Sequence, residues 1–386
     1  MSDGPLSDLR VIELGNIVAG PFASSILADM GADVIKVERP GTGDIIRGSG
    51  ETGEAMFGAL NRNKRSVVLD LKDDDERADL IGLLRDADVF IENLGRGTPD
   101  RIGIGYETLS EVNPELVYLS IKGFQPGPYG DRAGMDVVAE AMSGLMGVTG
   151  EPGRQPVRVG TSIADMGAAL YGVIGVLLAL RERSTTGEGQ RVDATLYESA
   201  SHWMGYWLSY ADRTGRDPEK LGASHPSWGL YDIFETDPEE WVFVGVTSER
   251  HWPALCRVLE AEDLLADERF DTATKRRERK TELRRTVAES IADWDREKLI
   301  AALEAERVPV APVNQPSDLI DDEGLLAADL LTEYTSPADG ESAQTVLAPV
   351  IGERFEPTQR LDPPALGEHT DAVLDEVVDD AADADD

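Results

Sequence analysis

Positive charge is scarce in this 386-residue chain, and this shortage is the first property that limits its function. Lysine and arginine number 37 against 74 acidic residues, which gives a formal net charge of −37. Nucleic-acid binding needs basic patches, so the balance argues against a nucleic-acid partner. A chain this acidic either stays disordered or folds with an acidic surface that concentrated salt screens. Long apolar periodic segments favour the second alternative, a folded protein of a halophilic, salt-rich cytoplasm.

Cysteine and histidine are also rare, which limits the available chemistry. The single cysteine, Cys256, cannot form an intrachain disulfide and is expected to be a buried, inert thiol. The four histidines, at positions 202, 225, 251 and 369, lack metal-ligand spacing and do not suggest a Ser-His-Asp triad. The chain also lacks a P-loop, a G-x-S-x-G elbow and a G-x-G-x-x-G motif after its first predicted strand. We therefore expect no metal site and no permanently bound cofactor.

No segment has the pattern of a signal peptide or of a membrane span. The N-terminus lacks a basic region followed by an apolar run. The longest uncharged apolar stretch, Met166–Leu180, is shorter than the roughly 20 residues that cross a bilayer. Charged residues, Asp165 and Arg181, flank this stretch, and glycines interrupt it. These features predict a buried core helix in a cytoplasmic protein without a membrane partner.

The first half of the chain alternates strand-like and helix-like patterns. Apolar runs predict strands at Val11–Leu14, Asp33–Val37, Ser66–Leu71, Asp88–Ile91, Leu116–Ile121 and Gln190–Ala194. Helices are predicted at Pro21–Met30, Asp74–Arg85, Ile163–Arg183 and Leu196–Tyr210. This alternation predicts an α/β fold with a parallel, doubly wound sheet, whose ligands bind beyond the carboxyl ends of the strands. The loops expected to carry function are therefore Gly15–Pro21, Glu38–Asp44, Glu92–Arg101 and Lys122–Gly130.

The composition along the chain also predicts a domain boundary. A polar linker at Asp212–Pro218 follows a large domain of residues 1–211. The small domain, residues 222–325, opens with predicted strands at Tyr231–Phe234 and Trp241–Val246 and continues with charged helices. Residues 326–386 return to loops and a short helix, and the acidic tail at 379–386 is expected to fray.

One carboxylate, Asp165, stands at the start of the long apolar helix. An acid in a first helical turn is favoured by the helix dipole, and spacing alone makes it more often a cap than a catalytic group. In the alternative interpretation, the helix start and nearby Arg158 hold Asp165 ionised in a semi-buried cleft. A partly desolvated carboxylate of this kind can act as a nucleophile.

Several motifs occur in a specific order along nearly the whole chain. They are Val18–Phe22 (VAGPF), Leu27–Glu38 (LADMGADVIKVE), Asn61–Ser66 (NRNKRS), Glu92–Leu94 (ENL), Thr186–Gln190 (TGEGQ) and Val308–Asn314 (VPVAPVN). In this order and spacing the sequence resembles the family III CoA-transferases, which include formyl-CoA transferase, carnitine CoA-transferase and α-methylacyl-CoA racemase. The resemblance implies an interlocked homodimer. Each chain would form a large Rossmann-like domain, completed by residues 326–386, and a smaller α+β domain.

The resemblance also implies a reaction, because Asp165 occupies the position of the family's nucleophile. Asp165 would attack the donor thioester to give a mixed anhydride, and the released CoA thiolate would then form an aspartyl-CoA thioester. The acceptor carboxylate would attack next, and the thiolate would complete the exchange. Coenzyme A is then a substrate, and neither ATP nor a metal is needed.

Further contacts are implied for the loops that follow the predicted strands. The residues expected to bind CoA are Val18, Ala19, Arg39, Lys72, Asn93, Leu94 and Arg101, whose cations suit phosphate groups. For Lys72, a solvated surface charge is an equal alternative. Asp136 matches a second active-site carboxylate of formyl-CoA transferase, and it is expected to contact the reacting groups or to cap the segment Asp136–Met146. Arg47, Arg154 and Arg158 are candidates for pairing with a distal carboxylate of the acceptor.

The chain departs from the racemase branch of the family. Racemases carry a histidine just before the second carboxylate, where this chain has Met135, and a glutamate where it has Ser248, next to Glu249. Proton abstraction beside a thioester needs a positioned base, and Met135 cannot provide one. A racemase is therefore the first rival interpretation, and a non-catalytic acyl-CoA-binding protein is the second.

The three arginines and the inferred halophilic setting lead to an expected substrate pair, and the resemblance leads to an expected lid. We expect a CoA-transferase that uses succinyl-CoA as donor and a short dicarboxylate such as mesaconate as acceptor. The stretch Gly222–Gly229 corresponds to a flexible loop of the family. It is expected to close over the reactive anhydride, although a plain turn is the alternative.

Overall fold

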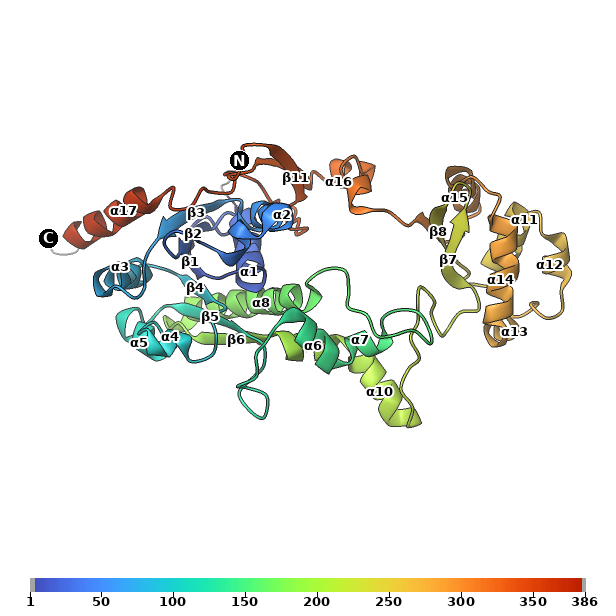
Figure 1. Ribbon diagram of the computed structural model, residues 1–386, viewed down its shortest axis with the longest axis horizontal. Coiled ribbons are helices and arrows are strands. Elements are labelled where there is room, and N and C mark those ends of the chain that lie inside the picture. Colours follow the sequence, from blue (N-terminus) through green and yellow to red (C-terminus); the bar gives the residue numbers. More distant parts are fainter. Residues whose placement is uncertain (1–3, 384–386) are drawn as a thin grey trace. The chain divides into compact units, whose positions relative to one another are not determined.

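The computed structural model describes residues 4–383, and these divide into two compact units (Figure 1). The larger unit consists of residues up to Leu145, Arg158–Ser209 and residues from Asp322 onward. The smaller unit consists of Met146–Val157 and Tyr210–Asp321. Residues 146–157 thus lie in the smaller unit, whereas the sequence analysis placed them in the large domain.

A six-stranded parallel sheet forms the centre of the larger unit. Its strands are β1 (Arg10–Leu14), β2 (Asp33–Glu38), β3 (Lys64–Val68), β4 (Val89–Glu92), β5 (Val117–Lys122) and β6 (Arg191–Thr195), in the order β3-β2-β1-β4-β5-β6. β1 pairs with both β2 and β4, so the strand order reverses between β1 and β4. The predicted α/β fold with a parallel sheet is confirmed. A reversal of this kind opens a crevice at the carboxyl ends of the strands, where ligands bind.

Both faces of the sheet are covered by helices. Side chains alternate along each strand, so that Val11 faces one hydrophobic cluster and Ile12 faces the other. The first cluster includes residues of α1 (Ala19–Asp29) and α8 (Ile163–Thr186). The second includes residues of α3 (Asp74–Arg85), α5 (Tyr106–Val112) and α17 (Thr370–Asp383). Burial on both faces explains why the strands are almost continuously apolar.

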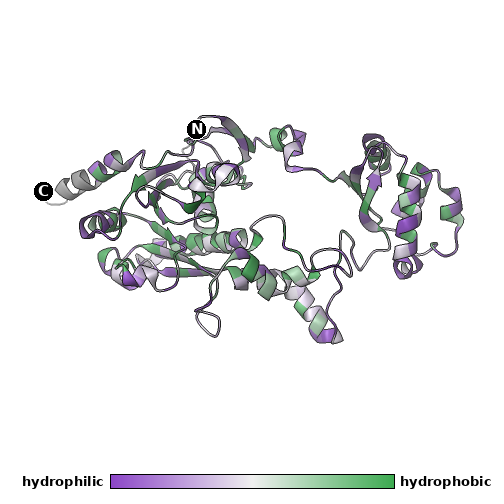
Figure 2. Ribbon diagram, in the orientation of Figure 1, coloured by the Kyte–Doolittle hydropathy of each residue, from purple (hydrophilic) through white to green (hydrophobic). Residues whose placement is uncertain are grey.

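The long helix α8 is mostly hydrophobic (Figure 2). It combines a buried face with an exposed apolar stripe. Its length and composition would allow it to cross a membrane, but its small residues pack against the sheet. At Gly172, for example, an added Cβ would lie 3.0 Å from the side chain of Leu119. The predicted core helix is therefore confirmed on this face. The stripe on the other side consists of Leu170, Ile174, Leu177 and Leu178, which are 43–65% exposed.

The larger unit contains further helices and strands, and the end of the chain returns to the sheet. They are η1 (Ile45–Gly48), α2 (Gly50–Asn61), α4 (Thr98–Arg101), α6 (Asp136–Ser143), α9 (Leu196–Trp203), α16 (Glu323–Ala327), β10 (Leu331–Thr335) and β11 (Ser342–Val346). Two short helices, α7 (Leu145–Val148) and α10 (Gly205–Thr214), span the boundaries between the units. Glu376 of α17 pairs with Arg10 and Arg65. α17 extends to Asp383, and residues 384–386 of the expected frayed tail lie outside the described residues.

Most predicted elements differ from the structure by a few residues at their ends, and two differ in a way that has a structural cause. The predicted helix Leu196–Tyr210 is wrong, because α9 ends at Trp203 and α10 begins at Gly205. The predicted strand Ser66–Leu71 is also wrong in its bounds, since β3 begins at Lys64 and ends at Val68. Lys64 looks like a surface residue in the sequence, but its side chain is fully buried against Glu13. A long-range ion pair therefore sets the start of this strand.

The smaller unit has its own antiparallel sheet and core. Its strands, in the order β7-β8-β9, are β7 (Tyr231–Thr236), β8 (Glu240–Gly245) and β9 (Val310–Pro312). Its helices are α11 (His251–Val258), α12 (Glu262–Ala266), α13 (Ala273–Glu278), α14 (Lys280–Ile291), α15 (Arg296–Ala305) and η2 (Pro316–Leu319). Cys256 lies in this core, where burial raises the pKa of its thiol to about 11, as expected for an inert cysteine.

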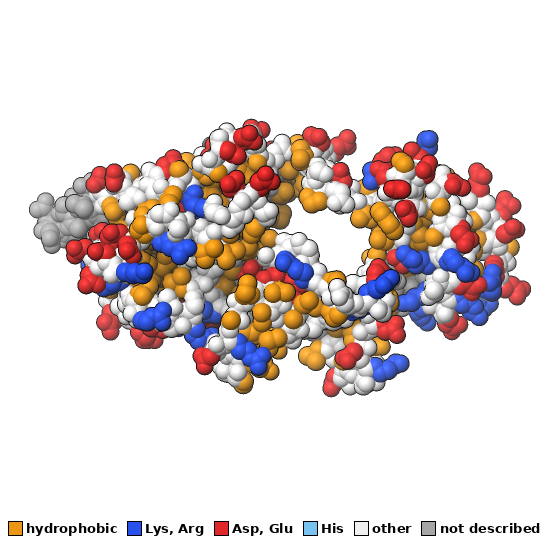
Figure 3. All heavy atoms as spheres, in the orientation of Figure 1, with side chains coloured by type: hydrophobic (Ala, Val, Ile, Leu, Met, Phe, Trp, Pro, Cys, Tyr) orange, Lys and Arg blue, Asp and Glu red, His pale blue; other side chains and the backbone are white. Residues whose placement is uncertain are grey.

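Acidic side chains are spread over the visible surface of each unit (Figure 3). Exposed charges of one sign repel one another, and molar salt reduces the Debye length to about 3 Å. The surface therefore fits the expectation of a protein adapted to concentrated salt.

Candidate active site

A cavity of about 720 Å³ lies at the carboxyl edge of the central sheet. Its walls come from the start of α1, the ends of β4 and β5 with the loops that follow them, the start of α9, and α8. The lining residues are Ala19, Asn93–Gly97, Ile121–Phe124, Gly130–Gly134, Asp165 and Leu196. Three of the four predicted loops contribute to it, and the loop Glu38–Asp44 does not. Its position is the crevice expected for a sheet whose strand order reverses at β1.

Two glycines close one wall of this cavity. Gly123 follows β5, Gly134 precedes α6, and their backbones lie so close that a Cβ added to either would come within 2.3 Å of the other's Cα. No side chain fits such an approach, so both positions require glycine. Their contact brings the two ends of the segment 123–134 together at the cavity wall.

Asp165 lines the cavity from the first turn of α8. The N-cap of this helix, Ser162, makes no side-chain capping bond. The cap comes from Asp136 at the start of α6, whose Oδ1 accepts hydrogen bonds from the N–H groups of Ala164 (2.8 Å) and Asp165 (3.3 Å). Within residues 4–383, no group donates a hydrogen bond to the Asp165 carboxylate. The cap interpretation thus applies to Asp136 and not to Asp165. The helix that Asp136 caps is α8, and not its own segment as the sequence analysis had considered.

The electrostatic environment of Asp165 is the opposite of the one expected. Burial, together with repulsion from Asp136, raises the pKa of Asp165 to about 7. The expectation that the helix start and Arg158 hold this carboxylate ionised is therefore wrong. Asp136 occupies the N–H groups of the helix start, and Arg158 extends toward Asp136 Oδ2 at 4.0 Å with 52% of its side chain exposed. Asp165 is a partly desolvated carboxylate without a compensating charge, a state typical of catalytic groups.

The two other arginines proposed for substrate binding have different surroundings. The Arg47 guanidinium donates to both carboxylate oxygens of Glu38, at 2.7 and 2.8 Å, and stacks on Phe57. Arg47 therefore makes a structural ion pair away from the cavity lining. Arg154 is exposed and belongs to the smaller unit. Arg158, in the larger unit, lies beside the Asp136–Asp165 pair.

The predicted CoA contacts separate into two groups. Ala19, Asn93 and Leu94 line the cavity. The Asn93 side chain accepts from the N–H of Asn16 and donates to its carbonyl, both at 2.9 Å, so it joins the loop after β1 to the loop after β4. Val18 is buried as the N-cap of α1.

Arg39, Lys72 and Arg101 do not line the cavity. All three are exposed, and they follow β2, β3 and β4 respectively. Their side chains form no ion pair within the described part of the chain; Arg39 donates to the Gly43 carbonyl and Arg101 to Thr98. Their roles in binding CoA remain predictions.

The structure adds cavity residues that the sequence analysis missed. Arg96 donates to the carbonyls of Phe124 (2.6 Å) and Gly130 (2.9 Å), and Arg132 lines the same wall. Lys122 pairs with Glu92 at the end of β4. Arg96 and Lys122 belong to loops that were predicted to be functional, so the loops were identified but their individual residues were not. Among the described residues, no group of three or more histidine, cysteine, aspartate or glutamate side chains is placed to hold a metal ion.

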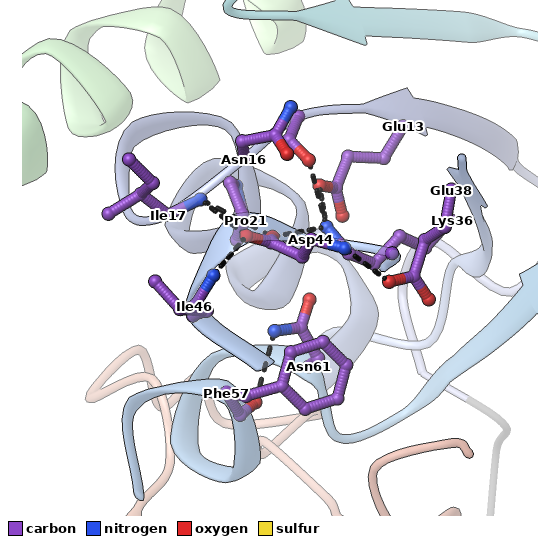
Figure 4. Close-up of polar contacts among 12 residues, drawn as sticks. Glu13, Asn16, Ile17, Pro21, Lys36, Glu38, Asp44, Ile46, Phe57 and Asn61 are labelled. Carbon is purple, nitrogen blue, oxygen red and sulfur yellow. Dashed lines mark hydrogen bonds and ion pairs between the residues drawn. The ribbon is translucent and has the colours of Figure 1, made fainter. Parts of the chain in front are cut away.

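A buried ionic network supports the loop between β1 and α1 (Figure 4). We define the paired network as Glu13, Lys36, Glu38, Asp44, Arg47 and Lys64. Lys36 Nζ lies 2.8 Å from Glu13 and 3.0 Å from Asp44, and Lys64 Nζ lies 2.8 Å from Glu13. Burial acts to raise the pKa of Glu13, but Lys36 and Lys64 outweigh it and lower that pKa to about 2. Three acids and three bases thus neutralise one another.

The paired network also holds the backbone of this loop. Lys36 donates to the Gly15 carbonyl and Lys64 to the Pro21 carbonyl, each at 3.0 Å. Asp44 accepts from the N–H of Ile17, a residue whose φ of 67° is unfavourable for a β-branched side chain. The network therefore fixes the strained turn that leads into Ala19 at the cavity wall.

The positions relevant to the rival racemase reaction carry no free base. Met135 is the N-cap of α6 and is 62% exposed. Glu249, in the smaller unit, pairs with Arg276 at 2.8 Å, which lowers the pKa of Glu249 below its usual value. The stretch 222–229 also belongs to the smaller unit, and its His225 and Trp228 rings lie 4.4 Å apart. Its role as a lid remains a prediction.

Comparison with known proteins identifies the family of this chain. The sequence profile described as CoA-transferase family III matches residues 6–370. This chain belongs to the family III CoA-transferases. It is 37% identical to succinyl-CoA:mesaconate CoA-transferase of Haloarcula hispanica, over 97% of this chain and 96% of that protein. It is also 37% identical, with the same coverage, to succinate–glutarate CoA-transferase of Agrobacterium fabrum.

Solved structures agree with this assignment. A CaiB/BaiF family protein from Brucella suis superposes with a TM-score of 0.90 at 33% identity, over 97% of this chain and 99% of that one. The protein from Mycobacterium tuberculosis described as Rv3272 gives a TM-score of 0.82 at 27% identity. The predicted enzyme class is thus confirmed, and this CoA-transferase moves CoA between an acyl-CoA and a free carboxylate.

Proposed function

We propose that this CoA-transferase uses succinyl-CoA as donor and a short dicarboxylate such as mesaconate as acceptor, with Asp165 as its nucleophile. The observation that carries the proposal is the position of Asp165, a partly buried carboxylate without a compensating charge in the wall of a 720 Å³ cavity. The substrate pair is supported by the relatives, one of which is named for succinyl-CoA and mesaconate. A cavity of this size is within the range of small-molecule sites, roughly 300–1,000 Å³.

The reaction proceeds through four acyl transfers. An oxygen of ionised Asp165 attacks the succinyl thioester carbon, so that a succinyl–aspartyl anhydride forms and CoA leaves as a thiolate. The thiolate attacks the aspartyl carbonyl, giving an aspartyl-CoA thioester and free succinate. The acceptor carboxylate attacks that thioester, giving a second anhydride and the thiolate again. The thiolate finally takes the acceptor acyl group and regenerates the Asp165 carboxylate.

The raised pKa of Asp165 suits this sequence. A more basic carboxylate is a better nucleophile, and a pKa near 7 leaves a large fraction of Asp165 ionised at neutral pH. The lack of hydrogen bonds to its carboxylate lowers the cost of desolvation when the substrate arrives. Asp136, which holds the backbone of Asp165 in place, keeps the nucleophile aimed into the cavity.

CoA binding is assigned to the carboxyl edge of the sheet. The thioester end lies in the cavity beside Asn93 and Leu94, and the phosphates extend toward the exposed cations Arg39, Lys72 and Arg101. Arg158, beside Asp136, is the candidate partner for the distal carboxylate of the acceptor. CoA is a substrate in this scheme, and we assign no permanent cofactor.

The assembly and setting of the enzyme are part of the same proposal. The enzyme forms a homodimer in the cytoplasm of a halophile. The exposed apolar stripe on α8 supports self-association, because surfaces of this kind are usually covered by a partner. Small-molecule substrates are its ligands, without nucleic acid or membrane. Sedimentation in molar salt should give the mass of a dimer, and a monomer at micromolar concentration would contradict this part.

A panel of donors and acceptors tests the proposal. Assays in molar salt would pair succinyl-CoA with mesaconate, glutarate, oxalate and monocarboxylates, using the wild type and Asp165→Ala. We expect the highest kcat/KM with short dicarboxylates and a loss of about 1,000-fold or more in kcat for Asp165→Ala. Glu107→Gln, at an exposed site on α5, serves as a control. Transfer by Asp165→Ala at the wild-type rate would rule out the nucleophile, and a preference for monocarboxylates would rule out the substrate class.

A further inference from the structure

Glu140 is a fully buried carboxyl group next to the catalytic carboxylate, and the reaction scheme gives it no role. Its side chain is 0% exposed on α6. Oε2 accepts a hydrogen bond of 2.8 Å from the N–H of Val159, in the segment that leads into α8. Oε1 is buried and has no hydrogen-bond partner among the described residues. A buried oxygen without a partner is costly, so a proton or a further hydrogen bond is expected at Oε1.

Asp136 precedes Glu140 by one turn of the same helix. Residues four apart on a helix lie on the same face and can contact one another. Asp136 has the same arrangement as Glu140. Its Oδ1 accepts from the N–H groups of Ala164 and Asp165, and its Oδ2 is buried without a hydrogen-bond partner in the part of the chain that the structure describes. Each carboxyl group therefore holds the segment 159–165 with one oxygen and leaves the other unsatisfied.

A single proton resolves both deficiencies. Two adjacent ionised carboxylates would repel each other, whereas a carboxylic acid can donate one O–H to a neighbouring carboxylate. Burial raises the pKa of Glu140, and Asp136 adds to the effect by hydrogen bonding and repulsion, while the Val159 N–H and Arg158 act in the opposite direction. Asp136 accepts from two N–H groups and lies 4.0 Å from Arg158, whereas Glu140 accepts from one N–H group, so Glu140 is the member to which the proton is assigned.

We propose that Glu140 is a protonated positioning residue, which donates a hydrogen bond to Asp136 and so holds the segment that carries Asp165. This inference rests on the proposed role of Asp165 and adds the support on which that role depends. The acid–carboxylate pair holds the segment at two points, Val159 before the turn and Ala164 and Asp165 after it. Because the pair shares one proton, it places one negative charge near Asp165 instead of two.

The other charged groups around the pair have their own partners or lie at its edge. Arg158, from the segment before α8, approaches Asp136 Oδ2 at 4.0 Å and is half exposed. From α9, which packs against α6, Glu198 accepts from the Gln125 N–H and His202 lies 2.5 Å from the Tyr171 hydroxyl. From α8, the titratable neighbour of the pair is Asp165 itself.

Infrared difference spectroscopy tests the proton directly. Spectra of the wild type and Glu140→Gln, recorded in molar salt at the same pH, should differ by the C=O band of one protonated carboxyl group. Glu107→Gln, which removes an exposed glutamate, should leave that band unchanged. The absence of a carboxylic-acid band from the wild-type minus Glu140→Gln spectrum would overturn the proposal.

Two substitutions test the positioning role through kinetics. The amide of Glu140→Gln can donate to Asp136 and accept from Val159, so we expect kcat within about 3-fold of the wild type. Glu140→Ala removes both bonds, and we expect kcat to fall about 10- to 100-fold because Asp165 is displaced, with little change in KM for the acyl-CoA. The pH at which activity is half maximal should stay constant in Glu140→Gln and shift in Glu140→Ala.

The outcomes separate this inference from the proposed function. If Glu140→Ala does not fold, Glu140→Gln decides alone, and a loss of 10-fold or more in its kcat contradicts a neutral Glu140. The infrared band does not depend on transfer activity. A wild-type protein with the band but with no role for Asp165 would therefore refute the proposed nucleophile and leave the shared proton in place.

Discussion

Two groups of carboxylates in the larger unit, one buried and one partly buried, differ in how their charges are compensated. In the paired network, Glu13, Glu38 and Asp44 contact Lys36, Lys64 and Arg47 within 3.0 Å. In the acid cluster, defined as Asp136, Glu140 and Asp165, the nearest cation is Arg158, which is half exposed and 4.0 Å from Asp136. The pKa of Glu13 is lowered to about 2, whereas the pKa of Asp165 is raised to about 7.

The difference shows which buried carboxylates stabilise the fold and which carboxylate remains reactive. Complete pairing makes a buried carboxylate inert, and the paired network uses its charges to hold the turn before α1. Incomplete pairing leaves Asp165 basic and accessible from the cavity. A buried charge without a partner destabilises a protein, so its presence beside a cavity is typical of a functional site.

Breaking the paired network should have the largest effect on stability. Glu13→Gln leaves Lys36 and Lys64 buried near each other without their shared partner. We expect a loss of about 3–5 kcal/mol in the free energy of unfolding, measured by chemical denaturation in molar salt. Glu107→Gln is the matched surface control. A loss below 1 kcal/mol for Glu13→Gln would show that the network is less buried than described.

Removing the charge of Asp165 should instead raise the free energy of unfolding. The folded-state pKa of about 7 lies above the ordinary value of 3.8, so the native state binds the proton more tightly than the unfolded state does. The ionisation of Asp165 therefore lowers the free energy of unfolding of the wild type as pH rises from about 4 to about 7. Asp165→Asn removes this loss and should gain at most about 4 kcal/mol over the wild type above pH 7, less where water screens the carboxylate, and little below pH 4. Equal stability of both proteins across this range would contradict the raised pKa.

The catalytic rate should follow the ionisation of Asp165. In the proposed mechanism only the ionised carboxylate attacks the thioester, so kcat/KM should rise with pH and level off above about pH 7. At pH 5, two pH units below that pKa, we expect activity about 100-fold below the plateau. A profile that is flat between pH 5 and 8 would show that Asp165 is ionised throughout, as in the paired network.

The weakest expected effect concerns Arg158. It is half exposed and 4.0 Å from Asp136, and surface pairs of this kind contribute about 0–1 kcal/mol. Arg158→Gln should therefore leave the unfolding free energy within about 0.5 kcal/mol of the wild type and raise KM for the dicarboxylate acceptor alone. Arg213→Gln, another exposed arginine, is the control. An unchanged KM for the acceptor would remove Arg158 from the acceptor site.

The sequence predicted those features that depend on local pattern. Apolar runs and turn residues gave the parallel α/β fold, the helix α3 with its observed bounds, and three of the loops that line the cavity. Asp165 was predicted to be the nucleophile only because the motifs around it resemble those of a known family. Local pattern cannot reveal the start of β3, because Lys64 is buried by an ion pair with Glu13, 51 residues away.

Tertiary contacts also explain the errors at the site. Hydropathy and spacing placed Asp165 at a helix start with Arg158 nearby, which predicts an ionised carboxylate. Asp136, 29 residues earlier, takes the helix N–H groups instead. Burial of Asp165, together with repulsion from Asp136, then raises the pKa of Asp165. Glu140 carried no recognisable signal in the sequence, since a glutamate within a helix is usually a solvated surface residue.

Trapping the covalent intermediate tests the central claim most directly. The wild type would be incubated with succinyl-CoA and hydroxylamine in molar salt, digested, and analysed by mass spectrometry. An aspartyl anhydride or thioester should convert to a hydroxamate at Asp165, dependent on succinyl-CoA, while Glu140, Asp136 and the paired network remain unmodified. Labelling of another carboxylate, or no labelling under conditions in which CoA is transferred, would contradict Asp165 as the nucleophile.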